Sequence, residues 1–164
     1  MIRRGLQILV AASCAFACSA PASKPEGVKN PPDAGSGPCT TDPRVDAYAP
    51  NMSKPGESGV LTFEIVKSEP APPMQGNNTF TVKITDQAGT AIAADVRIDL
   101  TMADRNQPTT VDPVVTFDAM TGIYTIAPLS MHLPGVWKVA FDAMMDSDAG
   151  VTADLVTFYF CIES

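Results

Sequence analysis

The sequence predicts an all-β fold: an antiparallel β-sandwich of about seven strands, preceded by a signal peptide and a disordered tether. Three observations lead to this prediction. After Gly59, short runs alternate apolar and polar residues with the period of two that a half-buried strand shows. Gly, Pro, Asp and Asn residues separate these runs, as they separate strands in sheets. The last run is apolar on both faces, and a single open sheet would leave one of those faces in water.

Residues 1–17 resemble a bacterial lipoprotein signal peptide. Arg3 and Arg4 precede an uncharged, mostly apolar run that is shorter than the roughly 20 residues needed to span a bilayer. A lipoprotein signal ends at a cysteine that becomes acylated, and both Cys14 and Cys18 follow small residues. We expect acylation at Cys18, because it leaves the longer apolar run. Acylation at Cys14 and export without a lipid are the alternatives. An acylated Cys18 would anchor the chain to the lipid bilayer.

Residues 18–38 are predicted to be a disordered, Pro-rich tether. They contain Pro, Gly and Ser but almost no large aliphatic residue. Such a segment cannot bury enough apolar surface to offset its loss of chain entropy on folding. We expect it to hold a domain of residues 39–164 away from the membrane. Within that domain, residues 39–55 show no clear period, and we expect them to pack as irregular chain.

The period-two pattern defines the strands of the sandwich. Each apolar set points to one face and the Thr, Lys, Arg and Asp residues between them to the other. A glycine in residues 86–89 supplies the positive φ of a tight turn. We expect Phe80, Tyr124 and Trp137 to lie in the core. For Trp137, an exposed binding aromatic is the alternative. The predicted strands are residues 60–66, 79–85, 95–101, 114–117, 122–126, 135–141 and 154–162.

Cys39 and Cys161 stand at the two ends of the predicted domain. Export places them where disulfides form, and a disulfide closing so long a loop stabilises a fold. We expect these two cysteines to be bonded, with a pair of free thiols as the alternative.

The net charge and the signal peptide limit which partners and which cellular location we expect. The formal charge of −7 repels phosphate backbones, so we expect no nucleic acid partner. Ser19, after Cys18, is not the aspartate that resembles an inner-membrane retention signal. We therefore expect a lipid-anchored protein of the cell envelope, at the outer membrane of a Gram-negative bacterium.

Several motifs of the predicted sandwich match a known family. They are residues 78–82, the turn at 86–89, Met102 after a strand, residues 121–124 and residues 131–137, which contain a Pro-Gly-x-Trp strand start. In these features the chain resembles the YtkA-like domain family, relatives of FixH. The resemblance implies an immunoglobulin-like sandwich. FixH-like relatives are linked with cation transport and cytochrome oxidase assembly, so the resemblance also implies such a link for this chain.

Some members of that family carry a Met/His-rich stretch after the third strand. Here residues 101–107 keep Met102 and contain no histidine. A copper site could still use Met131 and His132, with Met102, Met144 or Met145 nearby, because thioether and imidazole ligands suit Cu(I). The alternative is that the methionines fill the core and His132 lies in a polar turn. We expect no cofactor, with copper as the alternative.

Other sites have less support. The acids Asp142, Asp146 and Asp148 miss the spacing of a calcium loop, and we expect a solvated loop there. His132 is the sole histidine, and no serine has the flanking glycines of a hydrolase nucleophile, so we expect no enzyme. The sequence predicts a non-catalytic lipoprotein that binds an envelope protein through sandwich edges or end loops. Copper handling or oxidase assembly is the alternative function.

Overall fold

The computed structural model describes residues 39–147 and 150–163. The predicted signal peptide, the tether and both candidate lipidation sites, Cys14 and Cys18, lie outside the described residues. Within the described ranges, no helix is long and apolar enough to span a membrane.

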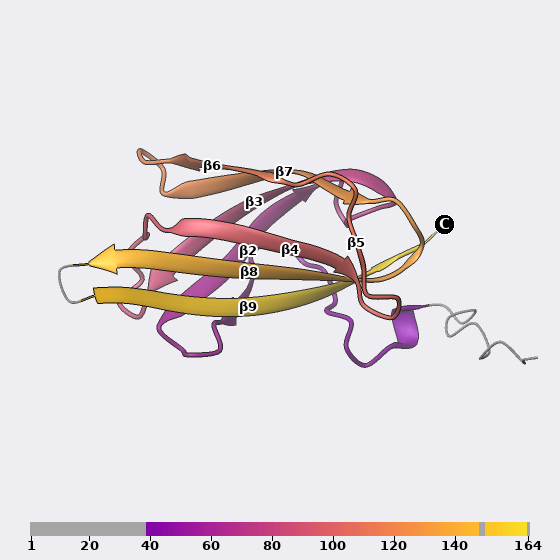
Figure 1. The fold of residues 1–164 in the computed structure, drawn as a ribbon, viewed down its shortest axis with the longest axis horizontal. Helices are drawn as coiled ribbons and strands as arrows, with labels where there is room; N and C mark the ends of the chain where they lie inside the picture. The colour runs from indigo at the N-terminus through magenta and orange to yellow at the C-terminus, as the bar shows by residue number, and fades with distance from the viewer. Residues whose placement is uncertain (1–38, 148–149, 164) are drawn as a thin grey trace, which may run out of the picture. The chain divides into compact units, whose positions relative to one another are not determined.

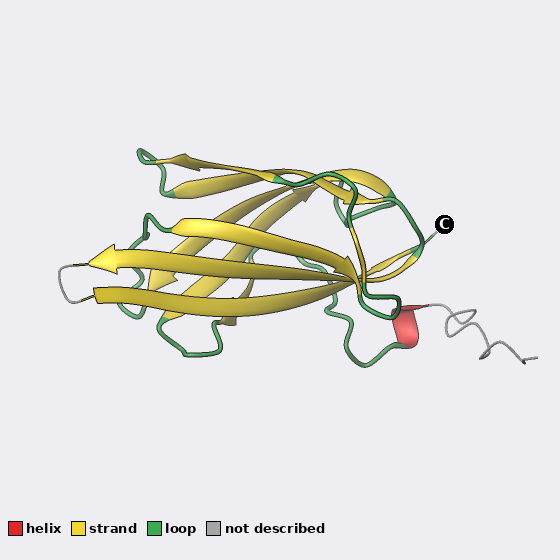
Figure 2. Cartoon of the chain, in the orientation of Figure 1, coloured by secondary structure: helices red, strands yellow, loops and turns green. Residues whose placement is uncertain are grey.

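Two antiparallel sheets make up the described domain, as Figures 1 and 2 show. The first sheet has the order β1-β2-β3-β7-β6 and the second the order β5-β4-β8-β9. The predicted all-β antiparallel sandwich is therefore confirmed. In chain order the strands are β1 (Met52–Pro55), β2 (Leu61–Glu69), β3 (Gly76–Asp86), β4 (Asp95–Met102), β5 (Gln107–Pro108), β6 (Val114–Asp118), β7 (Ile123–Met131), β8 (Gly135–Ser147) and β9 (Gly150–Ile162).

The core lies between the two sheets and follows the alternation of the sequence. Phe80, on β3, packs edge-to-face on Phe160 of β9, with ring centroids 5.4 Å apart. Phe63 of β2 meets Phe141 of β8 across the sandwich in a tilted arrangement, with ring centroids 6.3 Å apart. The other buried core residues are Leu, Ile, Val and Met residues from both sheets, together with Tyr124, Trp137, Ala143 and Phe158. Burial of this surface is the main force that holds the sheets together.

Two strands lie where the sequence predicts none. β1 falls in the segment expected to be irregular chain, and it pairs with β2 from Met52 to Pro55. Its four residues are alternately half-buried and exposed and contain one large apolar side chain, so they show no usable period. β5 has two residues and pairs with the end of β4. Both strands are held by backbone hydrogen bonds to a neighbouring strand. They are too short to show an apolar pattern in the sequence.

The last hairpin is longer than predicted. β8 and β9 stay paired from Gly135 with Ile162 to Ser147 with Gly150. The residues beyond position 141 continue the alternation with Ala143, which is fully buried. Alanine gives little hydrophobic signal, so the sequence pattern fades before the strand ends.

A disulfide joins Cys39 to Cys161, the pairing that the sequence predicts. Cys39 begins a short 3-10 helix, η1 (Cys39–Thr41), and Cys161 lies near the end of β9.

Asp46 fastens the segment between η1 and β1. Lys54 on β1 binds its carboxylate with an N–O distance of 2.6 Å. The Asp46 carboxylate also accepts a hydrogen bond from the Tyr159 N–H, 2.8 Å away. The segment before β1 is thereby fastened to β9.

Candidate functional site

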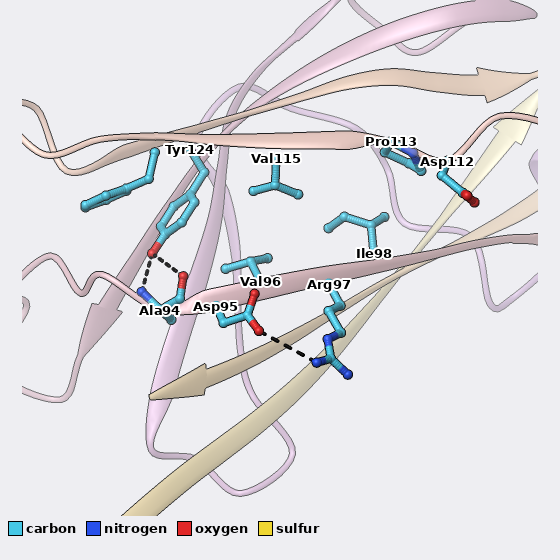
Figure 3. A pocket seen from close by; sticks show the side chains of 10 residues that line it. Ala94, Asp95, Val96, Arg97, Ile98, Asp112, Pro113, Val115 and Tyr124 are labelled. Carbon is cyan, nitrogen blue, oxygen red and sulfur yellow. Dashed lines mark hydrogen bonds and ion pairs between the residues drawn. The ribbon is translucent and has the colours of Figure 1, made fainter. Parts of the chain in front are cut away.

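A cleft opens between the edges of the two sheets, where β4 and β6 face each other. Its cavity measures about 420 Å³. Ile98 on β4 and Val115 on β6 point toward each other across it (Figure 3). The lining residues are Ala94, Asp95, Val96, Arg97, Ile98, Asp112, Pro113, Val115, Phe117 and Tyr124.

One wall of the cleft is an open strand edge. β4 pairs with β8 along its whole length, from Asp95 to Met102. On its other side β4 pairs with β5 at Thr101 and Met102, and no described strand covers residues 95–100 there. An edge of this kind presents unpaired N–H and C=O groups to a partner chain.

The direction of the free backbone groups follows from one hydrogen bond. The Leu100 carbonyl points away from β8, because it accepts a hydrogen bond from the Thr109 N–H at 3.0 Å. Backbone groups alternate between the two sides of a strand from one residue to the next. Val96 and Ile98 therefore direct their N–H and C=O groups toward the open side as well.

The opposite wall belongs to β6, the edge strand of the other sheet. Among the described strands β6 pairs with β7 alone. Val115 and Phe117 are half-buried against the core, whereas Val114 is 64% exposed on the opposite face of β6. The Phe117 ring packs on the Tyr124 ring with centroids 4.6 Å apart. The wall is thus apolar and firmly packed.

The Tyr124 hydroxyl closes one end of the cleft. It accepts a hydrogen bond from the Ala94 N–H at 2.6 Å (Figure 3). It also donates one to the Ile92 carbonyl at 2.8 Å. Burial raises the pKa of Tyr124, although the hydrogen bond from Ala94 acts in the opposite direction. This hydroxyl bridges β7 to the chain that leads into β4, so its role is to position that edge.

Charged groups stand on the rim of the cleft. Asp95 and Asp112 carry negative charges, and Arg97 is the single cation among its lining residues. Arg97 lies 3.7 Å from Asp95, and both side chains are more than two-thirds exposed. Next along β4, Asp99 binds Lys138 of β8 at 3.1 Å. Exposed pairs of this kind contribute little to stability.

A second cavity lies beside the disulfide and measures about 770 Å³. Tyr48, Pro72, Met74 and Phe160 contribute apolar surface to it. The one aspartate in its lining, Asp46, is already bonded to Lys54. The lining also contains a second acid, Glu163.

The structure gathers part of the predicted metal set at one end of the sandwich. Met102 is the cross-strand partner of Trp137, and its Cε atom lies against Gly135. His132, half-buried, has its ring edge-on to Trp137 with centroids 5.5 Å apart. Its Nδ1 atom is buried without a hydrogen-bond partner among the described residues. Met131 is fully buried in the core cluster, as is Trp137.

The suggestion that Met144 or Met145 joins this set is wrong. Both lie near the far end of β8, and Gly135 and Met144 are about 30 Å apart at roughly 3.3 Å per residue. Of the acids considered for calcium, Asp142 and Asp146 lie on β8, and Asp148 is outside the described residues. In the described chain no group of three or more His, Cys, Asp or Glu side chains could hold a metal ion.

Sequence reasoning missed one buried acid. Asp154 of β9 is 3% exposed, and its carboxylate accepts hydrogen bonds from the backbone N–H groups of Ser58, Val60 and Leu61. The signal was present, because Asp154 shares the parity of the inward-facing Val156. An acid at an inward position indicates a carboxylate that is satisfied by buried donors.

A family model described as YtkA-like matches residues 56–142, just over half of the chain. The crystal structure of FetP from uropathogenic Escherichia coli strain F11 aligns with 70% of this chain and 94% of that chain, with 14% identity and a TM-score of 0.42. A search of the curated proteins found no match.

Proposed function

The chain belongs to the YtkA-like family, and from this premise we propose that it is a non-catalytic binding module of the bacterial cell envelope. An acylated Cys18 holds it at the outer membrane in this proposal, and the folded domain binds an envelope protein. The disulfide between Cys39 and Cys161 supports an exported location, because such bonds persist in oxidising compartments.

The observation that carries the binding role is the cleft between β4 and β6. Two strand edges from different sheets meet there over a cavity of about 420 Å³, where apolar side chains of both strands lie beside the charged Asp95, Arg97 and Asp112. Binding sites are concave and mostly apolar, with a few polar groups that set orientation. Here the polar groups are free backbone atoms of β4 and the charges of its rim.

The groups in the cleft support binding rather than catalysis. The Tyr124 hydroxyl is committed to the backbone of Ile92 and Ala94. Asp95 faces Arg97, Asp112 is an exposed carboxylate on the rim, and His132 is not among the lining residues. General acid–base catalysis needs a titratable group within reach of the substrate and free to exchange a proton.

Photo-crosslinking in the native envelope tests the binding role. A photoreactive phenylalanine analogue replaces Val114, which is 64% exposed and adjoins the cleft-lining Pro113 and Val115, or Val151, which is 70% exposed near the start of β9. We expect a discrete protein adduct from position 114 and none from the matched control at position 151. Equal labelling at both positions, or no adduct at either, would refute the cleft as the binding site.

A separate experiment tests the anchor. Metabolic labelling with a palmitate analogue should mark the wild-type chain and the Cys14→Ser variant, but not the Cys18→Ser variant. Label that persists in Cys18→Ser and disappears in Cys14→Ser would move the anchor to Cys14. An unlabelled wild-type chain would end the lipoprotein proposal.

A copper-handling role is the second candidate, and one observation favours it. The buried Nδ1 atom of His132 has no partner in the described structure, and it lies in the turn that packs on Met102. Imidazole and thioether groups suit Cu(I), and a neighbouring Trp face attracts cations. His132 would hold the ion with Met102, beside Trp137.

Titration with Cu(I) under reducing conditions distinguishes this candidate. Wild-type protein should bind one equivalent and lose Trp137 fluorescence, whereas His132→Phe, which keeps a ring against Trp137, should do neither. Met145→Leu, at the far end of β8, is the control and should bind normally. If the wild-type chain does not bind, or if His132→Phe binds as well as wild type, the copper role is excluded.

A further inference from the structure

We propose that the open edge of β4 receives an added β-strand from its partner, an extended segment in which aliphatic residues alternate with the charge order basic–acidic–basic. This inference rests on the proposed binding role of the cleft and specifies the chemistry of the partner. In such strand addition, main-chain hydrogen bonds supply affinity, and alternate side chains supply specificity.

The free part of the edge has defined ends. At one end the Tyr124 hydroxyl occupies the Ala94 N–H, 2.6 Å away. At the other end the Leu100 carbonyl already accepts the Thr109 N–H. Between them lie Val96 and Ile98, whose N–H and C=O groups face outward. A strand opposite residues 95–99 would satisfy all four groups.

β5 demonstrates that this edge accepts an antiparallel strand. Gln107 pairs with Met102 and Pro108 with Thr101, on the same side of β4 as the free groups. The chain then leaves the edge after Thr109 and reaches β6 at Val114. An incoming strand would continue the line of β5 along β4, with β5 setting its register.

The cleft accounts for the aliphatic positions of the partner. Side chains on its inward face would enter the cavity between Ile98 of β4 and Val115 of β6 (Figure 3), which Phe117 of β6 also lines. These walls are half-buried and apolar, so further apolar surface is covered on binding. Two aliphatic side chains spaced by two residues match the spacing of Val96 and Ile98.

The outward face of β4 accounts for the charges. Asp95, Arg97 and Asp99 alternate in sign along it, and each is paired at most through exposed groups. Directly opposed residues on neighbouring strands interact, favourably when their charges differ. A partner with basic, acidic and basic residues at these positions is complementary to all three.

The same charges disfavour a second copy of this chain. An antiparallel pairing of two β4 edges that uses the free window of residues 95–99 is centred on Arg97. It would oppose the two arginines, and each Asp95 to an Asp99. Like charges directly opposed across strands destabilise the pairing. Pairing shifted to either side would collide with β5 or with the hydrogen bond from Ala94 to Tyr124.

Two peptides test the inference against the full chain. One contains Lys-Val-Glu-Ile-Lys and the control contains Glu-Val-Lys-Ile-Glu, with the same aliphatic residues and length. Fluorescence anisotropy should show the first binding about tenfold more tightly, since the control opposes like charges at every position. The double variant Asp95→Lys with Asp99→Lys should reverse this preference, because both substitutions lie on exposed side chains.

Hydrogen exchange reports the bonding itself. Binding of the first peptide should slow exchange of the Val96 and Ile98 amides and leave the Arg97 amide, paired to β8, unchanged. If neither peptide binds while the crosslink at Val114 forms, strand addition is refuted and the binding role stands. If the crosslink is also absent, both fail. Protection of Val96 and Ile98 that rises with protein concentration, without peptide, would identify a second copy and overturn the inference.

Discussion

The carboxylate of Asp154 fills the space that any side chain on Gly56 would require. Asp154 belongs to β9 of one sheet, and Gly56 precedes β2 of the other. The same carboxylate accepts hydrogen bonds from the N–H groups of Ser58, Val60 and Leu61 at 2.9 to 3.0 Å. One acid therefore fastens the start of the first sheet to the second.

Substitution of Asp154 should destabilise the fold strongly. Asp154→Ala leaves buried backbone donors unsatisfied, and the free energy of unfolding should fall by about 3 kcal/mol or more. Urea denaturation followed by Trp137 fluorescence measures the change. Asp99→Ala, on the exposed face of β4, is the control and should cost less than about 1 kcal/mol. Equal effects of the two substitutions would contradict the role assigned to Asp154.

The Gly56→Ala substitution should also destabilise, because its methyl group overlaps the Asp154 carboxylate. In the Asp154→Ala background that overlap is gone, so Gly56→Ala should cost less there. A double-mutant cycle measures this coupling, which we expect to be about 1 to 3 kcal/mol. Strictly additive effects would mean that the two residues are energetically independent.

Stability should decline in acid through Asp154. Burial by itself raises the pKa of Asp154, but hydrogen bonds from Leu61, Ser58 and Leu155 outweigh it, so that the pKa is lowered. A lowered folded-state pKa adds stability above the unfolded value of about 3.9, and this stability is lost as pH falls through the folded value. Asp154→Asn should show a flatter decline of unfolding free energy below about pH 4.

The comparison must be between wild type and Asp154→Asn, since other acids titrate in the same range. The hydrogen bond with Arg44 lowers the pKa of Asp42 to about 2. That residue contributes equally to both proteins and cancels in the difference. Identical acid profiles for the two proteins would contradict the assignment.

Loss of the disulfide should lower stability without changing the sheets. Cys39 and Cys161 are 122 residues apart, and closing so long a loop stabilises by about 4 to 5 kcal/mol in the chain-entropy model. Denaturation of the wild type with and without reductant should show this difference. The Cys39→Ser/Cys161→Ser double variant should match the reduced wild type and be insensitive to reductant. A reductant effect that persists in that variant would trace to another bond.

Local patterns were sufficient where side chains alternate strongly. The inward positions of β3, including Phe80 and Ile84, could be predicted because each residue's face depends on its immediate neighbours. They were insufficient for β1 and β5, which are held by pairing to distant strands and contain too few apolar residues to show a period. Sequence proximity also misled at Met144, since an extended strand carries it far from His132.

Taken alone, the sequence determined the fold class, the core face of most strands and the bond between Cys39 and Cys161. Alternation and cysteine placement are properties of the chain itself, and burial of apolar surface acts on them in any compact arrangement. Only the tertiary structure decided that β4 and β6 leave their edges open to one cleft, and that Asp154 meets backbone groups 93 to 96 residues away. Those features depend on which strands become neighbours, and contacts between distant segments decide that order.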